Sequence, residues 1–412
     1  MLNPTLHKFD YVEKVKLRVG DLRVGMYVCE LDRPWLETPF TLQGIEIKNE
    51  SDIETIRRHC DFVYIDLART RLVRIDVGAV PVKSYTNKSR LVTLERELET
   101  ASSARENTAG LVKTFIQEVQ FGNSVDIQLA KAAVSECVAS VMRNADAMMF
   151  MTQLRSKNEY VSEHAFNVCI YAIVIGRLAG LATWELENLG TCALLHDMGT
   201  VRIPDLVLNK PGKLNGEEFD IVKMHPIWGR DILMSGRNLF TGTVDVAYAH
   251  HETLNGTGYP RGLQGAQINR NSKIVAIADK YDAIVSARPY RKARDHLNAI
   301  GVLNKMAAAS QLDGELTTGF VSYLGIYPPG TLVELSSGEV AIVLETNPGN
   351  RLKPQLLVIR DAFLQPVEKF VDMSEVATGD GDRQYRITKV WQPEEIGVEL
   401  ARYKDAIVRA LG

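Results

Sequence analysis

The sequence predicts a mainly α-helical protein with a small β-rich unit at each end. Apolar residues recur at helical spacing through the middle of the chain, whereas near the N-terminus they alternate with polar residues. Short apolar runs separated by glycine-containing turns follow in the C-terminal part, which is a strand pattern. The chain has 412 residues, of which 45% are hydrophobic, so two or three domains with sizeable cores are expected.

Residues 1–80 are expected to form a small β-rich N-terminal domain. Val15, Leu17 and Val19 alternate with polar residues, as the inward-facing positions of a strand do. Residues 26–29 and 62–65 read as two further strands of the same domain.

A short helix is expected between these strands, because Ser51 and Glu54 have the spacing of a capping box. Residues 81–90 are polar and are interpreted as a linker. A mostly helical pattern then runs from residue 93 to about residue 158. We therefore assign residues 81–150 to a helical linker and leading helices.

Residues 151–326 are expected to form the helical core. Ala165, Val168 and Ala172 follow one face of its first helix. Asn215 and Glu218 form another capping-box pattern. The expected core helices are 160–179, 183–196, 215–233, 244–252, 273–286 and 297–310.

Residues 327–412 are expected to form a small β unit that ends in a helix. Its predicted strands are 331–335, 340–344 and 355–359, with turn residues between them. The terminal helix is expected from about residue 393.

Composition excludes several classes of protein. The chain has 48 basic and 51 acidic residues, a balance that argues against a DNA-coating protein. Its five cysteines form no Cys-x-x-Cys pair, so we expect buried thiols in a reducing cytoplasm and no thiolate zinc site. The N-terminus lacks the apolar core of a signal peptide, and the most apolar stretch, 168–182, is interrupted by Arg177. We expect a cytoplasmic protein without membrane insertion.

Histidines and aspartates gather in the helical middle. A single histidine on a helix is more often a core or surface residue than a ligand, but this set clusters without cysteines in the same motifs. The candidate metal ligands are His164, His196, Asp197, His225, His250, His251 and Asp279.

The spacing of these residues suits a metal cluster. His196 and Asp197 are adjacent at a helix end, so their side chains point about 100° apart and can reach one cluster from two directions. The two oxygens of Asp197 can bridge two ions, and His250 and His251 can serve different ions. Asp279 lies in an apolar helix, where an unpaired carboxylate would be costly.

Histidine and carboxylate ligands suit Fe, Mn, Ni or Zn in a hydrolytic site. Two such ions, about 3.5–4 Å apart, can polarise a phosphate and generate hydroxide at neutral pH. The residues therefore predict metal-dependent hydrolysis of a phosphodiester. A set of unrelated helix histidines is the competing interpretation.

Several motifs in this region resemble the signatures of HD-GYP domains. The matching segments are 196–199 (His-Asp-Met-Gly), 203–205, 210–214, 225–226, 250–260 (His-His-Glu to Gly-Tyr-Pro), 278–282 and 286–291. The resemblance covers roughly residues 160–327, with the motifs in the family's order and spacing. Residues 26–35 resemble a domain of unknown function that precedes HD-GYP in many bacterial proteins.

The resemblance implies a bacterial cyclic di-GMP phosphodiesterase built on an HD-domain helical bundle. Its product would be linear pGpG, and a second cut to GMP stays open. Family analogy gives the seven ligands named above, two divalent metal ions (Fe or Mn first, with Ni or Zn as alternatives), and catalytic roles for His196 and Asp197.

The resemblance also implies substrate contacts. Arginine suits phosphate or guanine, and lysine is a weaker candidate here. The loop that ends at Pro260 would line the site, although a plain surface turn is the alternative. The expected substrate-binding residues are Arg288, Arg291, Lys213, Gly258, Tyr259 and Pro260.

Two positions depart from the family pattern. Thr200 stands where many members have a lysine, and Arg202 is a candidate substitute. Tyr160 stands where some members have a glutamate that recruits a third metal, so we expect two metals.

Other functions stay open beside hydrolysis of cyclic di-GMP. With Thr200 in place of the lysine, the domain could act as a weakly catalytic cyclic di-GMP sensor that signals through its flanking domains. Another cyclic dinucleotide could be the substrate. The loop around Gly258 could also dock a diguanylate cyclase, and a homo-oligomer is left open.

Overall fold

The computed structural model describes residues 14–32, 45–66, 92–154, 160–236, 241–286, 295–347, 352–375 and 386–411. The chain divides into two compact units, residues 1–86 and 87–412. Each unit has its own hydrophobic core.

The N-terminal unit is an antiparallel sheet with one helix. Its strands β1 (Lys14–Arg18), β2 (Tyr27–Leu31), β3 (Ile45–Glu46) and β4 (Phe62–Asp66) are ordered β1-β4-β2-β3. Helix α1 (Glu50–His59) buries Ile53 and Ile56 in the core of this unit, together with Val28, Val63 and Ile65 of the strands. The expected strands and helix are confirmed.

The predicted capping box of α1 was wrong by two residues. Asn49 is the N-cap, and its side chain accepts a hydrogen bond from the backbone amide of Asp52. The Asp52 carboxylate in turn accepts hydrogen bonds from the backbone amides of Asn49, at 3.2 Å, and Lys48, at 2.8 Å. This pair satisfies the Asp52 amide in the first turn and the Asn49 amide at the cap, so the Ser51 and Glu54 side chains are not needed as caps.

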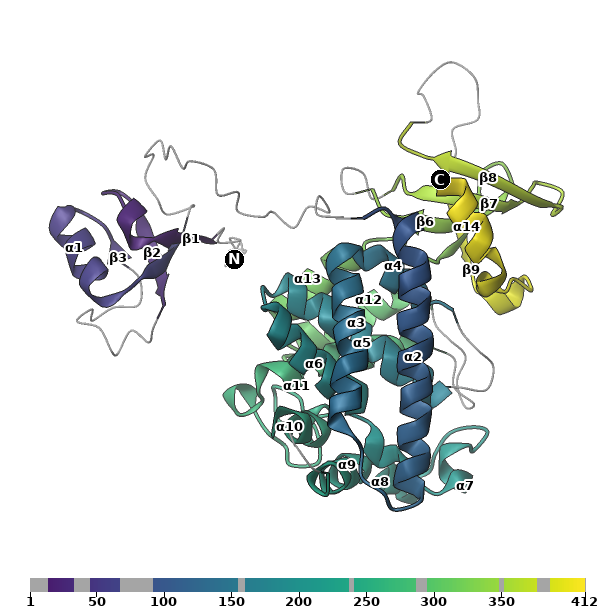
Figure 1. Ribbon diagram of the computed structural model, residues 1–412, viewed down its shortest axis with the longest axis horizontal. Coiled ribbons are helices and arrows are strands. Elements are labelled where there is room, and N and C mark those ends of the chain that lie inside the picture. Colours follow the sequence, from purple (N-terminus) through teal and green to yellow (C-terminus); the bar gives the residue numbers. More distant parts are fainter. Residues whose placement is uncertain are drawn as a thin grey trace, which may run out of the picture. The chain divides into compact units, whose positions relative to one another are not determined.

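The second unit is built around a helical bundle (Figure 1). Helices α2 and α3 run side by side along it, and α5 lies in its middle, in contact with α2, α3, α6, α11 and α13. The helices are α2 (Leu94–Gln120), α3 (Ile127–Arg143), α4 (Ala145–Met151), α5 (Tyr160–Leu178), α6 (Thr183–Leu195), α7 (Asp205–Leu208), α8 (Gly216–Val222), α9 (His225–Met234), α10 (Thr241–Ala249), α11 (Arg270–Val285), α12 (His296–Ala308) and α13 (Gly314–Leu324).

Helix α5 is apolar along most of its length, and other helices cover it. Among the described residues it is the one helix long and apolar enough to cross a membrane, but 78% of its apolar window is buried inside the fold. Its residues from Ser162 to Gly176 are buried. This is the pattern of a central core helix, which needs no polar face.

One predicted helix is two in the structure. The pattern over residues 215–233 divides into α8 and α9, with a turn at Lys223 and Met224. Pro226 lies in the first turn of α9, where its missing amide costs nothing, so it starts a helix rather than continuing one. The break makes His225 the first residue of α9. The capping box of Asn215 and Glu218 is confirmed.

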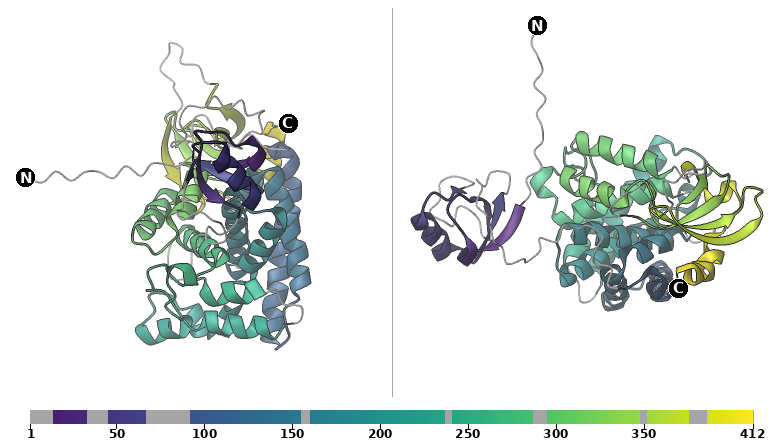
Figure 2. Two further views of the ribbon diagram at one scale, coloured as in Figure 1. Left: turned by 90° about the vertical axis from the view of Figure 1, so that its left-hand side faces the viewer. Right: turned by 90° about the horizontal axis from the view of Figure 1, so that it is seen from above.

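The C-terminal sheet packs at one end of the bundle (Figure 2). Its strands β5 (Leu332–Leu335), β6 (Val340–Glu345), β7 (Gln355–Arg360), β8 (Pro366–Asp372) and β9 (Ile387–Trp391) are antiparallel and ordered β8-β7-β6-β5-β9. Ile342 and Leu344 of β6 join the core of the bundle, whereas Ala341 and Val343 join a second cluster on the other face. Both faces are buried, which explains the continuous apolar run of β6.

The end of the chain differs from the expected helix at residue 393. Two short 3₁₀ turns, Pro393–Glu395 and Leu400–Tyr403, come before helix α14 (Lys404–Leu411). Helix α14 contacts both α2 and β8. Within the second unit, the domain boundaries expected at residues 150 and 326 stay predictions.

Candidate metal centre

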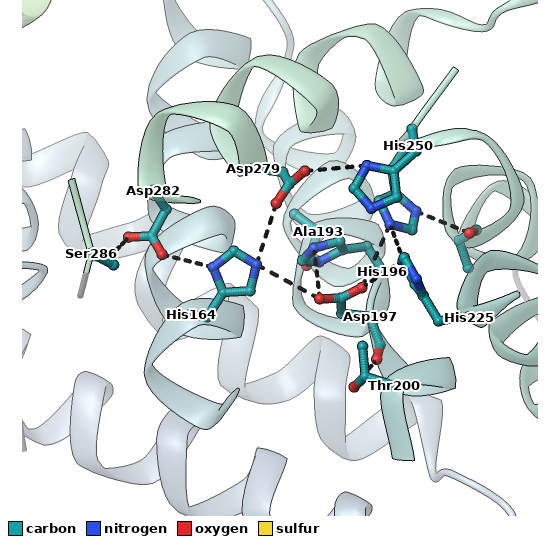
Figure 3. A network of polar contacts seen from close by, with 12 residues as sticks. His164, Ala193, His196, Asp197, Thr200, His225, His250, Asp279, Asp282 and Ser286 are labelled. Carbon is teal, nitrogen blue, oxygen red and sulfur yellow. Dashed lines mark hydrogen bonds and ion pairs between the residues drawn. The ribbon is translucent and has the colours of Figure 1, made fainter. Parts of the chain in front are cut away.

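Five segments of the bundle bring the seven predicted ligands to one place (Figure 3). His164 is in the first turns of α5, and Asp279 is on α11. His196 caps the C-terminus of α6, and Asp197 follows it at the start of the 3₁₀ turn Met198–Arg202. The remaining ligands are His225 at the start of α9 and His250 and His251 directly after α10.

The carboxylate of Asp197 lies between two groups of histidines. Its Oδ2 is 3.7 Å from Nε2 of His164 and 3.8 Å from Nε2 of His196. Its Oδ1 is 3.2 Å from Nε2 of His225 and 3.5 Å from Nε2 of His250. Each oxygen therefore faces a different pair of imidazoles.

The carboxylate of Asp279 spans the cluster in the same way. Its Oδ1 is 3.4 Å from Nε2 of His164, and its Oδ2 is 3.5 Å from Nδ1 of His251. Three groups of potential ligands result, each with its ligand atoms within 4.8 Å of one another. Two of them share no residue, and we call these the α5 set (His164, His196 and Asp279) and the α9 set (His225, His250 and His251). The third group, His196, Asp197 and His250, takes one histidine from each set.

The buried atoms of the cluster fit metal ions. Five of its side-chain atoms are buried without a hydrogen-bond partner in the described part of the chain: His164 Nε2, His196 Nε2, Asp197 Oδ1, His251 Nδ1 and Asp279 Oδ2. Buried polar atoms without partners are rare because each one loses the hydration it had in water. A cation between these atoms would satisfy them together, and imidazole with carboxylate is a ligand set for first-row transition metals.

The outer nitrogens of the imidazoles fix the tautomers. His196, His225 and His250 each place Nδ1 within 2.6, 2.6 and 2.9 Å of a backbone carbonyl oxygen three residues earlier. A carbonyl oxygen only accepts, so each Nδ1 carries the hydrogen and donates it. Each Nε2 then faces the cluster with its lone pair, as a metal ligand requires, and the Nε2 atoms of His225 and His250 lie 3.1 Å apart.

The electrostatics of the cluster keep its carboxylates ionised. Burial raises the pKa of Asp197, but His196 and His225 outweigh it and hold this pKa well below its usual range. Burial lowers the pKa of His196 to about 4. Burial also opposes the charged form of His164, yet the nearby carboxylates of Asp279 and Asp282 raise its pKa to about 10. A cation bound there would replace that proton.

The Gly-Tyr-Pro loop lies against the α9 set. The backbone amide of Tyr259 donates to the carbonyl of His251 at 3.2 Å, and the two rings lie 4.8 Å apart. A Cβ at Gly258 would be 2.4 Å from the amide nitrogen of Thr253 and 2.6 Å from the carbonyl oxygen of His251. Only glycine permits this approach of the loop.

The basic residues expected to contact substrate are not part of this loop. Lys213 is exposed in the segment between α7 and α8. Lys210, a weaker candidate, pairs with Glu218 at 2.7 Å. Arg288 and Arg291 lie outside the described residues.

The two departures from the family pattern sit beside the cluster. The Thr200 hydroxyl donates to the backbone carbonyl of Asp197 at 2.7 Å. The Tyr160 ring stacks on His164, with 5.7 Å between the ring centroids and 9° between the planes. Arg202 is exposed at the end of the 3₁₀ turn.

Two buried carboxylates near the cluster were not predicted as site residues. Asp282 is 2.7 Å from Nδ1 of His164, and Glu252 accepts backbone hydrogen bonds from Arg261 and Leu263. Asp282 is three residues after Asp279, on the same side of a helix, so helical periodicity could have found it. Glu252 had no such signal, because its partners belong to an irregular loop.

The fold and the cluster define an HD-domain protein. A family model described as "HD domain" matches residues 148–316, and a model of a domain of unknown function, DUF3391, matches residues 14–130. The Pseudomonas aeruginosa protein named cyclic di-GMP phosphodiesterase PA4108 is 32% identical over 387 residues, 91% of this chain and 93% of that protein. This chain belongs to the HD-GYP family, and the predicted resemblance is confirmed in both domains.

Two other relatives match over a smaller part of this chain. The response regulator RpfG of Xanthomonas campestris pv. campestris, named a cyclic di-GMP phosphodiesterase, is 43% identical over 122 residues, 29% of this chain and 32% of that protein. The Vibrio cholerae protein named 3′3′-cGAMP-specific phosphodiesterase 1 is 33% identical over 172 residues, 41% of this chain and 39% of that protein.

Proposed function

We propose that this protein is a metal-dependent phosphodiesterase that hydrolyses cyclic di-GMP to linear pGpG. The observation that carries the proposal is the division of the Asp197 carboxylate, with one oxygen toward each of two histidine groups. The full-length relative named a cyclic di-GMP phosphodiesterase supports the choice of substrate. Further cleavage to GMP remains part of the proposal to be tested.

The cluster would hold two divalent cations, Fe or Mn first and Ni or Zn as alternatives. The α5 set would hold one and the α9 set the other, with Asp197 between them. Such cations act as Lewis acids on a phosphate and lower the pKa of water. Tyr160 supports two cations rather than three, because its ring stacked on His164 brings no carboxylate to this side of the α5 set.

The protein's own residues orient and shield the reaction. His196 and Asp197 lie at the junction of α6 and the following 3₁₀ turn, and the hydrogen bond from Thr200 to the Asp197 carbonyl holds this junction. His196 and His250 are fully buried, so their Nε2 atoms are kept from bulk water. Preorganised polar groups in a site shielded from water stabilise charge that develops on a phosphate.

The substrate would lie on the side of the α9 set that carries the Gly-Tyr-Pro loop. The Tyr259 ring beside His251 offers a surface on which a base can stack, with Gly258 and Pro260 shaping the loop. Arg288, Arg291 and Lys213 are the proposed contacts to phosphate or guanine. Docking of a diguanylate cyclase on this loop, a homo-oligomer and a cytoplasmic location are kept as proposals.

A second candidate substrate is 3′3′-cGAMP. The observation that favours it is the Vibrio cholerae relative whose name specifies that dinucleotide. A weakly catalytic sensor of cyclic di-GMP is a further candidate, because Thr200 brings no cation next to Asp197. The presence of all seven ligands in one cluster favours an enzyme over a sensor.

Product analysis tests the proposal. Purified full-length protein would be incubated with cyclic di-GMP or 3′3′-cGAMP and Mn²⁺ or Fe²⁺ under reducing conditions, and the products separated by chromatography. We expect linear pGpG from cyclic di-GMP with the wild type and none with Asp197→Ala. Asp220→Ala, which changes an exposed aspartate of α8 outside the signature segments, is the matched control and should keep full activity.

The outcomes separate the candidates. Faster cleavage of 3′3′-cGAMP than of cyclic di-GMP would replace the proposed substrate. Intact substrate with every metal, despite bound metal and measurable binding of cyclic di-GMP, would favour the sensor.

A further inference from the structure

The histidines of the metal centre are supported in two different ways. His196, His225 and His250 donate Nδ1–H to neutral backbone carbonyls. His164 instead places Nδ1 2.7 Å from Oδ2 of Asp282. A carboxylate is therefore the partner of one imidazole in the α5 set, whereas carbonyls support His225 and His250 in the α9 set.

Asp282 is held firmly in this role. It is fully buried on α11, and its second oxygen accepts a hydrogen bond from Asn167 Nδ2 at 2.9 Å. The same oxygen accepts another from Ser286 Oγ at 3.0 Å (Figure 3). Asn167 lies on α5, three residues after His164, so the same helix presents both groups to Asp282. The arrangement fixes the ring of His164 in position and in rotation.

The chemical consequence falls on the opposite nitrogen of the ring. A hydrogen bond from imidazole to a carboxylate is charge-assisted, so it leaves more electron density on Nε2 than a bond to a carbonyl does. Nε2 of His164 is the atom that faces Asp279 and Asp197, at 3.4 and 3.7 Å. His164 should therefore be a stronger ligand than the carbonyl-backed histidines.

We infer that Asp282 is a positioning residue that makes the α5 set bind its cation more tightly than the α9 set. The two cations then bind in order, first at the α5 set and second at the α9 set. The inference rests on the two-cation site of the proposed function. It adds which position fills first and which residue, outside the ligands, sets the difference.

Metal titration of two pairs of variants tests the inference, each pair with one set disrupted and with or without Asp282→Asn. Metal-depleted full-length His225→Ala, which disrupts the α9 set, would be titrated with Mn²⁺, and free Mn²⁺ followed by electron paramagnetic resonance. Adding Asp282→Asn to this variant should raise the Mn²⁺ dissociation constant about 10- to 100-fold, the usual effect of removing a partner of a metal-bound histidine.

The reciprocal pair isolates the α9 set. His164→Asn removes the metal-binding nitrogen of the α5 set, and its amide can still donate to Asp282. Adding Asp282→Asn to this variant should leave the dissociation constant for Mn²⁺ unchanged within about twofold, because independent sites contribute additively. In the wild type, the two binding steps should differ by at least about tenfold, by the same histidine-partner effect.

The inference would be overturned if Asp282→Asn weakened Mn²⁺ binding equally in the His225→Ala and His164→Asn backgrounds. It would also be overturned if the two Mn²⁺ binding steps of the wild type had equal affinities. If Asp282→Asn does not fold, Asn167→Ala in the His225→Ala background is the second test. It removes one hydrogen bond to Asp282 and changes no metal ligand. It should weaken Mn²⁺ binding in the His225→Ala background and leave it unchanged in the His164→Asn background. Unchanged Mn²⁺ binding in the His225→Ala background would overturn the inference. Ser140→Ala, at a buried hydroxyl of α3, is the control for a general loss of packing and should change neither affinity.

These titrations need no substrate, so they separate the two proposals. If the protein does not hydrolyse cyclic di-GMP, but Asp282→Asn weakens Mn²⁺ binding only in the His225→Ala background, only the proposed function is rejected. Normal hydrolysis with equal loss in both pairs would reject only the role of Asp282.

Discussion

The carboxylate of Glu252 accepts a hydrogen bond of 2.7 Å from the backbone amide of Arg261. Its second oxygen accepts one of 2.9 Å from the amide of Leu263. Glu252 is 3% exposed and directly follows His251, so the bonds tie the end of the Gly-Tyr-Pro loop to the metal centre. The side chain thus anchors the backbone directly after Pro260.

We expect Glu252→Gln to loosen this loop. The amide of glutamine would keep one acceptor and present a donor to the other backbone amide, and hydrogen bonds to a charged group contribute about 1.5–3 kcal/mol. Hydrogen exchange at Arg261 and Leu263 should become faster, and KM for cyclic di-GMP should rise while bound metal stays the same. The exposed Glu217→Gln is the control. Unchanged exchange at both amides would contradict the role of Glu252.

Removal of metal should lower the melting temperature. Without cations, five buried atoms of the cluster have no hydrogen-bond partner among the described residues. A ligand that binds only the folded state at 100 times its Kd adds about 2.7 kcal/mol to stability. Calorimetry with a chelator and after return of Mn²⁺ would measure the change. Asp197→Ala should show a smaller response, and an equal response would place the stabilising metal elsewhere.

Gly199→Ala should destabilise the protein strongly. A Cβ at this position would lie 1.9 Å from the carbonyl oxygen of His225 and 2.4 Å from the amide nitrogen of Gly229, both of them backbone atoms. Overpacking costs about 1–3 kcal/mol, and contact with rigid backbone should place this variant at the upper end or beyond. Urea unfolding monitored by circular dichroism would show the loss.

Gly301→Ala is the matched control for that variant. Gly301 lies on the exposed side of α12, with no atom within 4 Å of an added Cβ. Alanine in a helix interior is favoured over glycine by about 0.5–1 kcal/mol, so this change should be neutral or stabilising. Similar losses in both variants would mean that the approach of residue 199 to α9 is not tight.

Arg143→Ala should weaken the packing of α2 against α3. Arg143 binds Glu97 through two hydrogen bonds of 2.7 and 2.8 Å, and Glu97 is 2% exposed. The variant leaves a buried carboxylate without this partner, and because Arg143 is itself partly exposed we expect a loss of about 2–3 kcal/mol. Arg409→Ala breaks an exposed pair with Glu368 and should cost much less, because water and salt screen that pair. Thermal unfolding would compare them.

The sequence alone was enough to predict the family, and it named seven candidate ligands that the fold brings to one cluster. The adjacent pair His196 and Asp197, and Asp279 within an apolar helix, are local features that point to a metal whatever the rest of the fold does. Helices α5 and α11 were likewise predicted from their long runs of apolar residues, which both helices bury. The exposed strands β8 and β9 lack such a pattern and were not predicted.

Only the tertiary structure decided how the ligands are shared and supported. The contact between His164 and Asp282 joins residues 118 positions apart, and the division of the Asp197 oxygens depends on where α5, α9 and α10 meet. Sequence spacing describes the direction of side chains along one helix, but not the approach of two helices, which packing of their other faces determines. The sequence by itself therefore determined which residues can hold metal, and the fold determined which of them act together.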